Sequence, residues 1–288
     1  MNISNITSTV DKLCKASRKD YINPYTHLEW PEQVQRQQWF TSPVLISLYG
    51  TELYDNLPET QRQELSFYEA VNFFSLNIHG EKALIEGLAH RLYKRDSKEI
   101  SAYLHHFLDE ENKHMIYFGE FCMRYAGKVY SDRKLTLPRD YAAGEEEFLF
   151  FAKVLIFEEI VDVYNVQMSL DESLVPIARK INRMHHRDEA RHLVFGRQLV
   201  KELFDRFSDQ WSPETLSGIR EYLTSYLVGT WKEYYNPDVY RDAGIPEPYE
   251  TQEQAFNHPR CREHRRKISG SCLKYLVDNN ILLAVPEL

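Results

Sequence analysis

The chain has 288 residues, of which 43% are hydrophobic, and its 43 acidic and 35 basic residues give a formal net charge of -8 at pH 7. This acidic balance argues against a nucleic-acid-binding protein, since such proteins usually present a basic face. No apolar run approaches the roughly 20 residues of a membrane span, and no N-terminal stretch has the order of a secretory signal peptide. The four cysteines form no C-x-x-C pair. We therefore expect a cytoplasmic protein with reduced thiols, and neither nucleic acid nor membrane as a partner.

Sparse glycine and proline, 11 and 12 residues, favour long helices and an all-α fold. Residues 1–62 have a mixed pattern with several turn signals, and helical spacing of apolar residues begins after them. The helices predicted from this spacing cover residues 64–94, 97–126, 145–170, 174–206, 213–233 and 262–279. The first four, joined by short links, predict a four-helix bundle core with additional helices, in one domain over residues 1–288.

The connecting segments carry cap and turn signals. Asp171 or Ser173 is expected to cap the fourth helix, because short oxygen side chains accept hydrogen bonds from the free N–H groups of a first turn. Ser212 followed by Pro213 is the expected start of the fifth helix. Residues 235–262 are rich in Tyr, Pro and Asn, and we expect them to form an ordered loop.

A carboxylate interrupts the apolar stripe of each of the four long predicted helices. Glu81, Glu111 and Glu189 lie among hydrophobic residues at helical spacing on the first, second and fourth helices. On the third helix, Glu158 and Glu159 both have apolar neighbours on their own faces, so either fits. A carboxylate buried alone costs several kcal/mol, so it must be protonated, paired or bound to a cation. Four carboxylates that converge in one core therefore predict cations between them.

Histidines accompany two of these carboxylates at a metal-ligand spacing. Glu111 and His114 form one Glu-x-x-His pair, and Glu189 and His192 form a second. Two such pairs with two lone glutamates on two further helices are the ligand set of di-iron carboxylate bundles. His185 shares the face of the second pair, since at ~100° per residue it falls within an arc of roughly 60° with Glu189 and His192. The alternative is that these residues lie on solvated helix faces.

Other ionisable residues near these motifs allow more than one interpretation. Glu110 lies four residues before His114 and competes with its neighbour as a ligand. Asp188 and Arg191 either orient ligands or form a surface ion pair. The basic run at residues 258–267 either holds an arginine over a binding pocket or forms a solvated helix end or a patch for a partner.

Several blocks of the chain resemble the di-iron N-oxygenases of bacterial natural-product pathways, of which p-aminobenzoate N-oxygenase is the best-known type. The blocks are HGEKALIEGL, DEENKHMIYF, LIFEEIVDVY and DESLVPIARKINRMHHRDEARH, with NPYTHLEWP and YNPDVYRDAGI as flanking stretches. The most specific feature is a histidine four residues before the final Glu-x-x-His, a position that His185 fills. The resemblance covers most of the chain.

The resemblance implies a ferritin-like bundle with seven metal ligands, and it favours Glu158 over Glu159. These ligands are Glu81, Glu111, His114, Glu158, His185, Glu189 and His192. It further implies two iron ions as cofactor and O2 as co-substrate. The chain shows no flavin, nicotinamide or iron–sulfur fingerprint, so electrons must come from an external donor or reductase.

The activity implied by the resemblance is N-oxygenation of an aryl or alkyl amine, free or carrier-bound, to a hydroxylamine, nitroso or nitro product. A homodimer is compatible with this function. Two alternatives are a di-iron oxygenase or oxidase that acts on C–H bonds of another small molecule, and an iron-handling protein of the ferritin type. His185 and the length of 288 residues argue against the ferritin type, whose subunits are much shorter.

Overall fold

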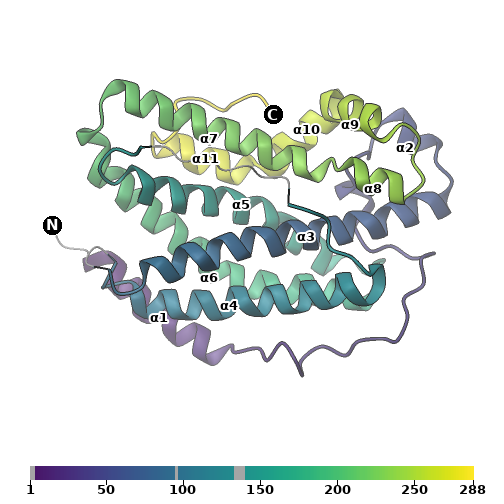
Figure 1. Ribbon diagram of the computed structural model, residues 1–288, viewed down its shortest axis with the longest axis horizontal. Coiled ribbons are helices and arrows are strands. Elements are labelled where there is room, and N and C mark those ends of the chain that lie inside the picture. The colour runs from purple at the N-terminus through teal and green to yellow at the C-terminus, as the bar shows by residue number, and fades with distance from the viewer. Residues whose placement is uncertain (1–3, 95–96, 133–139) are drawn as a thin grey trace.

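The structure, a computed structural model, describes residues 4–94, 97–132 and 140–288. Within these residues it is built from helices, and the pairing of Trp39 with Leu174 is an isolated β-bridge outside any strand. The all-α prediction is therefore confirmed. The four helices of the bundle core, called the four long helices below after their predicted counterparts, are α3 (Glu59–Arg91), α4 (Ser101–Phe121), α5 (Glu145–Leu170) and α6 (Pro176–Phe207) (Figure 1).

These four helices form two antiparallel hairpins joined by one long connection. Short links join α3 to α4 and α5 to α6. α3 is also antiparallel to α5, since Arg91 pairs with Glu147 at 2.7 Å and Phe73 stacks on Tyr164 with ring centroids 5.4 Å apart. α4 and α5 therefore run in the same direction, and the segment between them is the longest of the three connections. A single long crossover between two hairpins is typical of the ferritin-like core that the resemblance implied. The expectation of short links in an antiparallel bundle is wrong for α4 and α5, which are parallel and joined by a long segment.

Additional helices cover this core on two sides. α1 (Ser4–Lys19) packs against α4 and α6, whereas α7 (Pro213–Tyr234) and α11 (Gly270–Asp278) pack against α5 (Figure 1). The shorter helices are α2 (Glu52–Asn56), α8 (Pro237–Asp242), α9 (Pro248–Asn257) and α10 (Pro259–Ile268), with single turns at Pro43–Leu45, Cys122–Ala126 and Ser208–Gln210.

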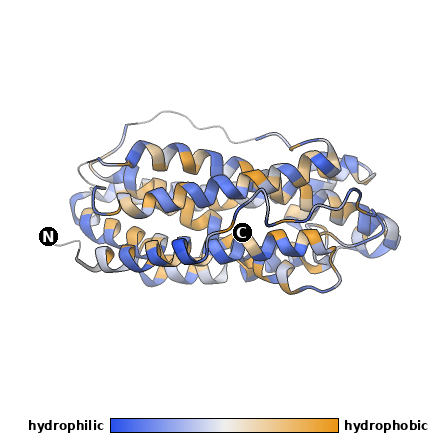
Figure 2. Cartoon of the chain, turned by 90° about the horizontal axis from the view of Figure 1, so that it is seen from below, coloured by the Kyte–Doolittle hydropathy of each residue, from blue (hydrophilic) through white to orange (hydrophobic). Residues whose placement is uncertain are grey.

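Hydrophobic and hydrophilic residues alternate along the helices (Figure 2), as expected for amphipathic elements around a core. Among the described residues, no helix combines the length and the apolar character that a membrane crossing requires. The four cysteines are buried and none forms a disulfide.

Two expectations for the connecting segments are wrong. Residues 235–262 are not a loop, because they contain α8, α9 and the start of α10. Each of these helices has proline in its first turn, where the missing N–H is harmless. The expected helix at 262–279 is in fact two helices, α10 and α11, which meet at Ser269 and Gly270.

The caps were partly predicted. Ser212 caps α7 as expected, since its side chain accepts a hydrogen bond from the N–H of Thr215 at 3.2 Å. Neither Asp171 nor Ser173 caps α6, which begins one residue after Val175 without a side-chain cap. The Asp171 carboxylate instead accepts hydrogen bonds from the hydroxyls of Ser42 and Ser173, both at 2.6 Å.

One buried carboxylate belongs to the fold rather than to the predicted metal ligands. Glu69 on α3 is 6% exposed and accepts a hydrogen bond from the N–H of Ser47 at 3.2 Å. The Ser47 hydroxyl also bonds Glu69 and lies 2.8 Å from the hydroxyl of Tyr240. Burial raises the pKa of Glu69 to about 7, although the bonds from Ser47 oppose this shift.

Replacing this residue, Glu69→Gln, is expected to make stability less dependent on pH. The folded-state pKa of about 7 lies above the ordinary 4.5, so this group's stabilising contribution is complete below pH 4.5 and is lost as the pH rises through about 7. The difference between these two pKa values corresponds to about 3 kcal/mol in the free energy of unfolding. Thermal unfolding near about pH 5 and about pH 8.5 should show a smaller fall in Tm for Glu69→Gln than for the parent. The exposed control Glu86→Gln should behave like the parent, and an equal fall in all three proteins would contradict the expectation.

Candidate metal centre

The seven residues predicted as ligands lie in one buried cluster between the four long helices. Each of them is at most 2% exposed, so the alternative of solvated faces is wrong. α3 provides Glu81, α4 provides Glu111 and His114, α5 provides Glu158, and α6 provides His185, Glu189 and His192. The fold thus brings these side chains together, and their role as metal ligands stays a prediction.

Their donor atoms are close enough to share cations. Three groups of three side chains each place one donor atom within 4.8 Å of the others: Glu81, His114 and His185; Glu111, His114 and Glu189; and Glu158, His185 and Glu189. His192 lies beside these groups, with its Nδ1 atom 2.9 Å from Oε1 of Glu111 and 3.2 Å from Oε1 of Glu189. Glu189, His114 and His185 each belong to two groups, and Glu189 is the one carboxylate among these three.

Many of these donor atoms lack a hydrogen-bond partner. The buried atoms without one include both oxygens of Glu81 and Glu111, Nδ1 of His114, Nε2 of His185, and Oε2 of Glu158 and Glu189. Nε2 of His185 lies only 3.0 Å from Oε1 of Glu189, yet no hydrogen bond joins the two atoms. Buried polar atoms are nearly always satisfied, so a cluster of such exceptions fits a site that can bind cations. Carboxylate and imidazole donors together suit iron or manganese.

Burial and mutual repulsion shift the pKa values in the cluster. Burial raises the pKa of Glu81 and of Glu158 well above the ordinary range. Burial also acts on Glu189, but the neighbouring imidazoles, first His192, hold its pKa well below the ordinary value. The pKa of His114 is raised well above its usual value, since the surrounding carboxylates outweigh burial. Divalent cations would replace the protons that balance this charge, so metal binding should release protons.

Charged side chains next to the cluster contact the outer ring nitrogens of His114 and His192, the histidines of the two Glu-x-x-His pairs. Nε2 of His114 lies 3.2 Å from Oδ2 of Asp188, and Nε2 of His192 lies 2.8 Å from Oε2 of Glu110. The Arg191 guanidinium donates to both carboxylates, at 2.6 Å to Glu110 and in a short contact to Asp188. One arginine therefore fixes both imidazoles, whose Nδ1 atoms face the cluster.

These three charged residues are buried, with exposed fractions of 3% for Glu110 and Asp188 and 8% for Arg191. The alternative of a surface ion pair is therefore wrong. Sequence reasoning named Glu110 only as a competing ligand and missed its role as a hydrogen-bond partner of His192. Its position directly before a Glu-x-x-His pair was the available signal.

His185 has a different partner. Nδ2 of Asn165 on α5 lies 2.8 Å from Nδ1 of His185, while Oδ1 of Asn165 is buried without a partner. A half-turn of this amide would let Oδ1 accept the Nδ1–H of His185, since the two ends of the amide have nearly the same shape. Nε2 of His185 would then present its lone pair to the cluster. Asn165 follows Glu158 by seven residues and so shares its face of α5.

The two candidate glutamates of α5 have different surroundings. Glu158 is one member of a cluster group. Glu159 is also buried, at 5% exposed, but it pairs with Arg197 on α6, outside the cluster. The geometry therefore favours Glu158.

The basic run at residues 258–267 lies on α10 and forms no part of the cluster. Its Arg265 is fully buried, where it donates to the hydroxyl of Tyr235 at 3.0 Å and to the carbonyl of Phe256 at 2.8 Å. Arg265 is thus neither a solvated end residue nor a pocket arginine, and it ties α10 to the preceding segment.

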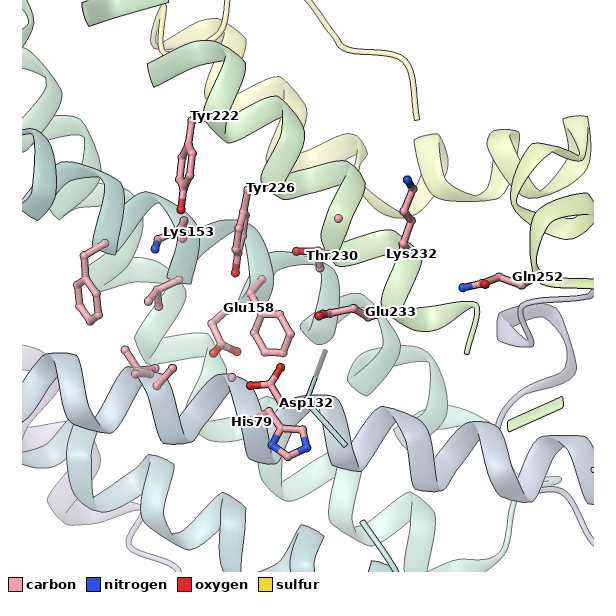
Figure 3. Close-up of a pocket in the computed structure, with 17 residues that line it drawn as sticks. His79, Asp132, Lys153, Glu158, Tyr222, Tyr226, Thr230, Lys232, Glu233 and Gln252 are labelled. Carbon is pink, nitrogen blue, oxygen red and sulfur yellow. The ribbon is translucent and has the colours of Figure 1, made fainter. Parts of the chain in front are cut away.

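A cavity of about 560 Å³ leads from the surface to the cluster between α3, α5 and α7 (Figure 3). Glu158 is the one predicted ligand that lines it. The aromatic part of its wall consists of Phe150, Phe157, Tyr222 and Tyr226. Tyr226 and Thr230 of α7 extend toward Glu158 (Figure 3), and Oγ1 of Thr230 is buried without a hydrogen-bond partner.

Comparison with known proteins identifies the family. A sequence model of the family described as p-aminobenzoate N-oxygenase AurF matches residues 4–278. The chain belongs to this family. Membership in the AurF family agrees with the resemblance carried by the motifs around Glu81, Glu111, Glu158 and Glu189.

Relatives of this AurF-family chain include Mb0909 of Mycobacterium bovis and Rv0885 of Mycobacterium tuberculosis, both described as uncharacterized proteins. Each is 26% identical over 213 residues, which cover 68% of this chain and 61% of the relative. The match thus spans about three-fifths of the length of these relatives.

Solved structures similar to the chain include a variant of an R2-like ligand-binding oxidase with an anaerobically reconstituted Mn/Fe cofactor. It is 16% identical, with a TM-score of 0.41 and coverage of 90% of this chain and 93% of the other. An R2-like ligand-binding oxidase with an aerobically reconstituted metal cofactor after photoconversion is also 16% identical, with a TM-score of 0.36 and coverage of 90% and 92%.

Proposed function

We propose that the protein is a non-haem di-iron oxygenase that N-oxygenates an aryl or alkyl amine with O2 and external electrons. The observation that carries this proposal is a buried set of carboxylate and imidazole donors without partners, in a chain of the p-aminobenzoate N-oxygenase AurF family. When bound, two iron ions would supply the electrons that reduce O2 for transfer of oxygen to the substrate. The product is a hydroxylamine, nitroso or nitro compound in a natural-product pathway.

The residues proposed to hold the two ions are Glu81, Glu111, His114, Glu158, His185, Glu189 and His192. Glu189 is the natural shared ligand, because it is the one carboxylate that belongs to two donor groups and a carboxylate has two oxygens to offer, whereas His114 and His185 each present one nitrogen to the cluster. Arg191, through its two carboxylate partners, keeps the outer nitrogens of His114 and His192 engaged so that their inner nitrogens face the ions.

The cavity beside Glu158 is the proposed place for the amine. Its aromatic walls displace water and hold a flat or apolar substrate, and the floor brings the nitrogen next to the cluster. Holding the amine there replaces a bimolecular encounter by a fixed geometry, which can lower the barrier by several kcal/mol. A cavity of about 560 Å³ also supports an organic substrate over iron storage as the function.

Gly229 supports this assignment of the cavity. It lines the cavity within α7, where glycine costs roughly 0.5–1 kcal/mol relative to alanine. A Cβ atom at this position would meet nothing within 4 Å, so packing does not require glycine. Its absent side chain therefore leaves room in the cavity.

The activity test uses protein loaded with ferrous ion, reduced chemically, and mixed with O2 and a panel of aryl and alkyl amines. Mass spectrometry should detect a product that gains one or more oxygen atoms on nitrogen. Oxygen found only on carbon would favour the C–H oxygenase. Storage of many irons per chain without an organic product would favour the ferritin type, and either result would overturn the proposal.

A filled cavity tests the substrate site separately. Gly229→Leu should lower amine turnover about tenfold or more by occupying the cavity, while iron content and Tm stay at the parental level. The matched control is Gly218→Leu on the same helix, because Gly218 is also exposed and free of contacts but does not line the cavity. Equal turnover in the two variants would place the amine elsewhere.

A further inference from the structure

The face of α6 that points away from the metal centre is strongly basic. Arg179, Lys180, Arg183 and Arg187 line a hollow of about 400 Å³ together with His27, Pro176 and Met184, and we call this set the basic groove. At ~100° per residue, Lys180, Arg183 and Arg187 lie roughly 120–180° around α6 from the ligands His185 and Glu189. Arg179 lies at the edge of this face, roughly 80–120° from the same two ligands. The basic groove and the predicted ligands therefore occupy opposite sides of the same helical turns.

The charge of the basic groove is balanced only in part, since Arg179 lies near enough to Asp171 to lower the pKa of that carboxyl. Arg187 pairs with Asp20 at 3.4 Å. In the part of the chain that the structure describes, Arg179, Lys180 and Arg183 form no ion pair within 4 Å, although the whole chain has a net charge of -8. Lys180 donates to the carbonyl of His27 at 2.7 Å instead.

The arginines of the basic groove also have few hydrogen-bond partners within the chain. Arg183 donates to the carbonyl of Ser169 at 3.1 Å, and Nε of Arg179 is buried without a hydrogen-bond partner. An excess of cationic donors around an open hollow fits carboxylate groups of a partner.

The route from the basic groove to the metal centre is short. A helix with its side chains is about 10–12 Å across, so one helix separates the surface from the ligands. Met184 lines the basic groove, is 3% exposed, and precedes His185 in the chain. A redox group bound at the basic groove would thus face the predicted metal ligands through a single packed layer.

We propose that the basic groove docks an acidic one-electron carrier protein of the ferredoxin type, which delivers the electrons for oxygenation through α6. This inference rests on the proposed function, because that reaction needs electrons that the chain has no cofactor motif to supply. Each transfer would oxidise the carrier's iron–sulfur cluster by one electron, and iron held by the predicted ligands would take up that electron in passing from ferric to ferrous. Small, transient, electrostatically steered contacts are typical of electron-transfer partners, so a few cations suffice.

The test uses iron-loaded protein and a reduced, acidic plant-type [2Fe–2S] ferredoxin as the probe. The groove variant combines Arg183→Glu and Arg187→Glu, with the milder Arg183→Gln and Arg187→Gln pair as a second variant. The matched control combines Lys201→Glu and Arg206→Glu, which changes the same charge at exposed positions further along α6. Calorimetry measures ferredoxin binding at low and high salt, and stopped-flow absorbance measures electron transfer to the iron.

The parent should bind ferredoxin, and added salt should weaken the complex. The groove variants should bind about tenfold or more weakly and accept electrons from ferredoxin correspondingly more slowly. The control should match the parent, and dithionite should reduce all proteins alike. No ferredoxin binding by the parent, or equal binding by groove and control variants, would overturn the proposal. Binding of inorganic phosphate in place of ferredoxin would also overturn it, in favour of a small-anion site.

The docking site and the proposed function can fail separately in these experiments. If dithionite-reduced protein oxidises no amine while ferredoxin binding still depends on the basic groove, the proposed function fails and the docking site stands. If the amine is oxidised with dithionite but ferredoxin does not bind, the docking site fails alone.

Discussion

Replacing Glu189 by alanine is expected to lower the iron content from about two ions per chain to one or fewer. Glu189 belongs to two of the three donor groups, and its Oε1 atom lies 3.0 Å from Nε2 of His185 and 3.2 Å from Nδ1 of His192. Its loss removes a donor from two of the three groups, so the remaining donors hold the cations less tightly. Anaerobic loading with excess ferrous ion, followed by gel filtration and elemental analysis, measures the content.

The matched control for this change is Glu159→Gln. Glu159 is a buried glutamate on the neighbouring helix α5, but it pairs with Arg197 and not with the cluster. This variant should keep about two ions. A Glu189→Ala protein that still binds two ions would show that the wrong face of α6 has been assigned to the metal.

Replacing Arg191 by methionine is expected to damage both stability and metal binding. The change leaves two carboxylates, Glu110 and Asp188, buried without their shared cation. Removing one partner of a buried ion pair costs about 3–5 kcal/mol, which corresponds to a fall in Tm on the order of 10 °C. The imidazoles of His114 and His192 would also lose their fixed orientation, and loss of such support typically weakens metal affinity about 10- to 100-fold.

The two effects of Arg191 can be separated by a compensated variant. Combining Arg191→Met with Glu110→Gln and Asp188→Asn removes the unpaired charges, so much of the lost Tm should return. Metal affinity should stay low, because an amide is a weaker acceptor for the Nε2–H of a histidine than a carboxylate. Thermal unfolding without metal and a competitive metal titration give the two readouts. If the compensated variant binds metal as tightly as the parent, the role of Arg191 is structural only.

Helical periodicity predicted most of the fold and of the candidate site that could be predicted from the sequence. The stripes around Glu81, Glu111 and Glu189 are buried as expected, because α3, α4 and α6 each have a solvated side that contrasts with the core. α5 lacks this contrast, since α7 and α11 cover its outer side. Glu158 and Glu159 are therefore both buried, and apolar neighbours alone do not separate them.

Other features depend on contacts between elements and left no periodic signal. The Glu110, Asp188 and Arg191 network joins α4 to α6, so spacing along one helix does not reveal it. α8, α9 and α10 have six to ten residues, which is too short for stable helices without tertiary packing. α1 is different, because Ile6, Val10 and Leu13 recur at helical spacing and are buried, so it could have been found.

The two hairpins of the bundle contribute equivalent motifs. The α3–α4 hairpin supplies Glu81 and one Glu-x-x-His pair, and the α5–α6 hairpin supplies Glu158 and the other pair. The predicted ligands therefore have approximate two-fold symmetry, and the cluster lies where the two hairpins meet. His185 has no counterpart in the first hairpin. The symmetry is therefore broken at a single residue. Two cations bound where the hairpins meet would differ in ligand field, redox potential and order of oxidation.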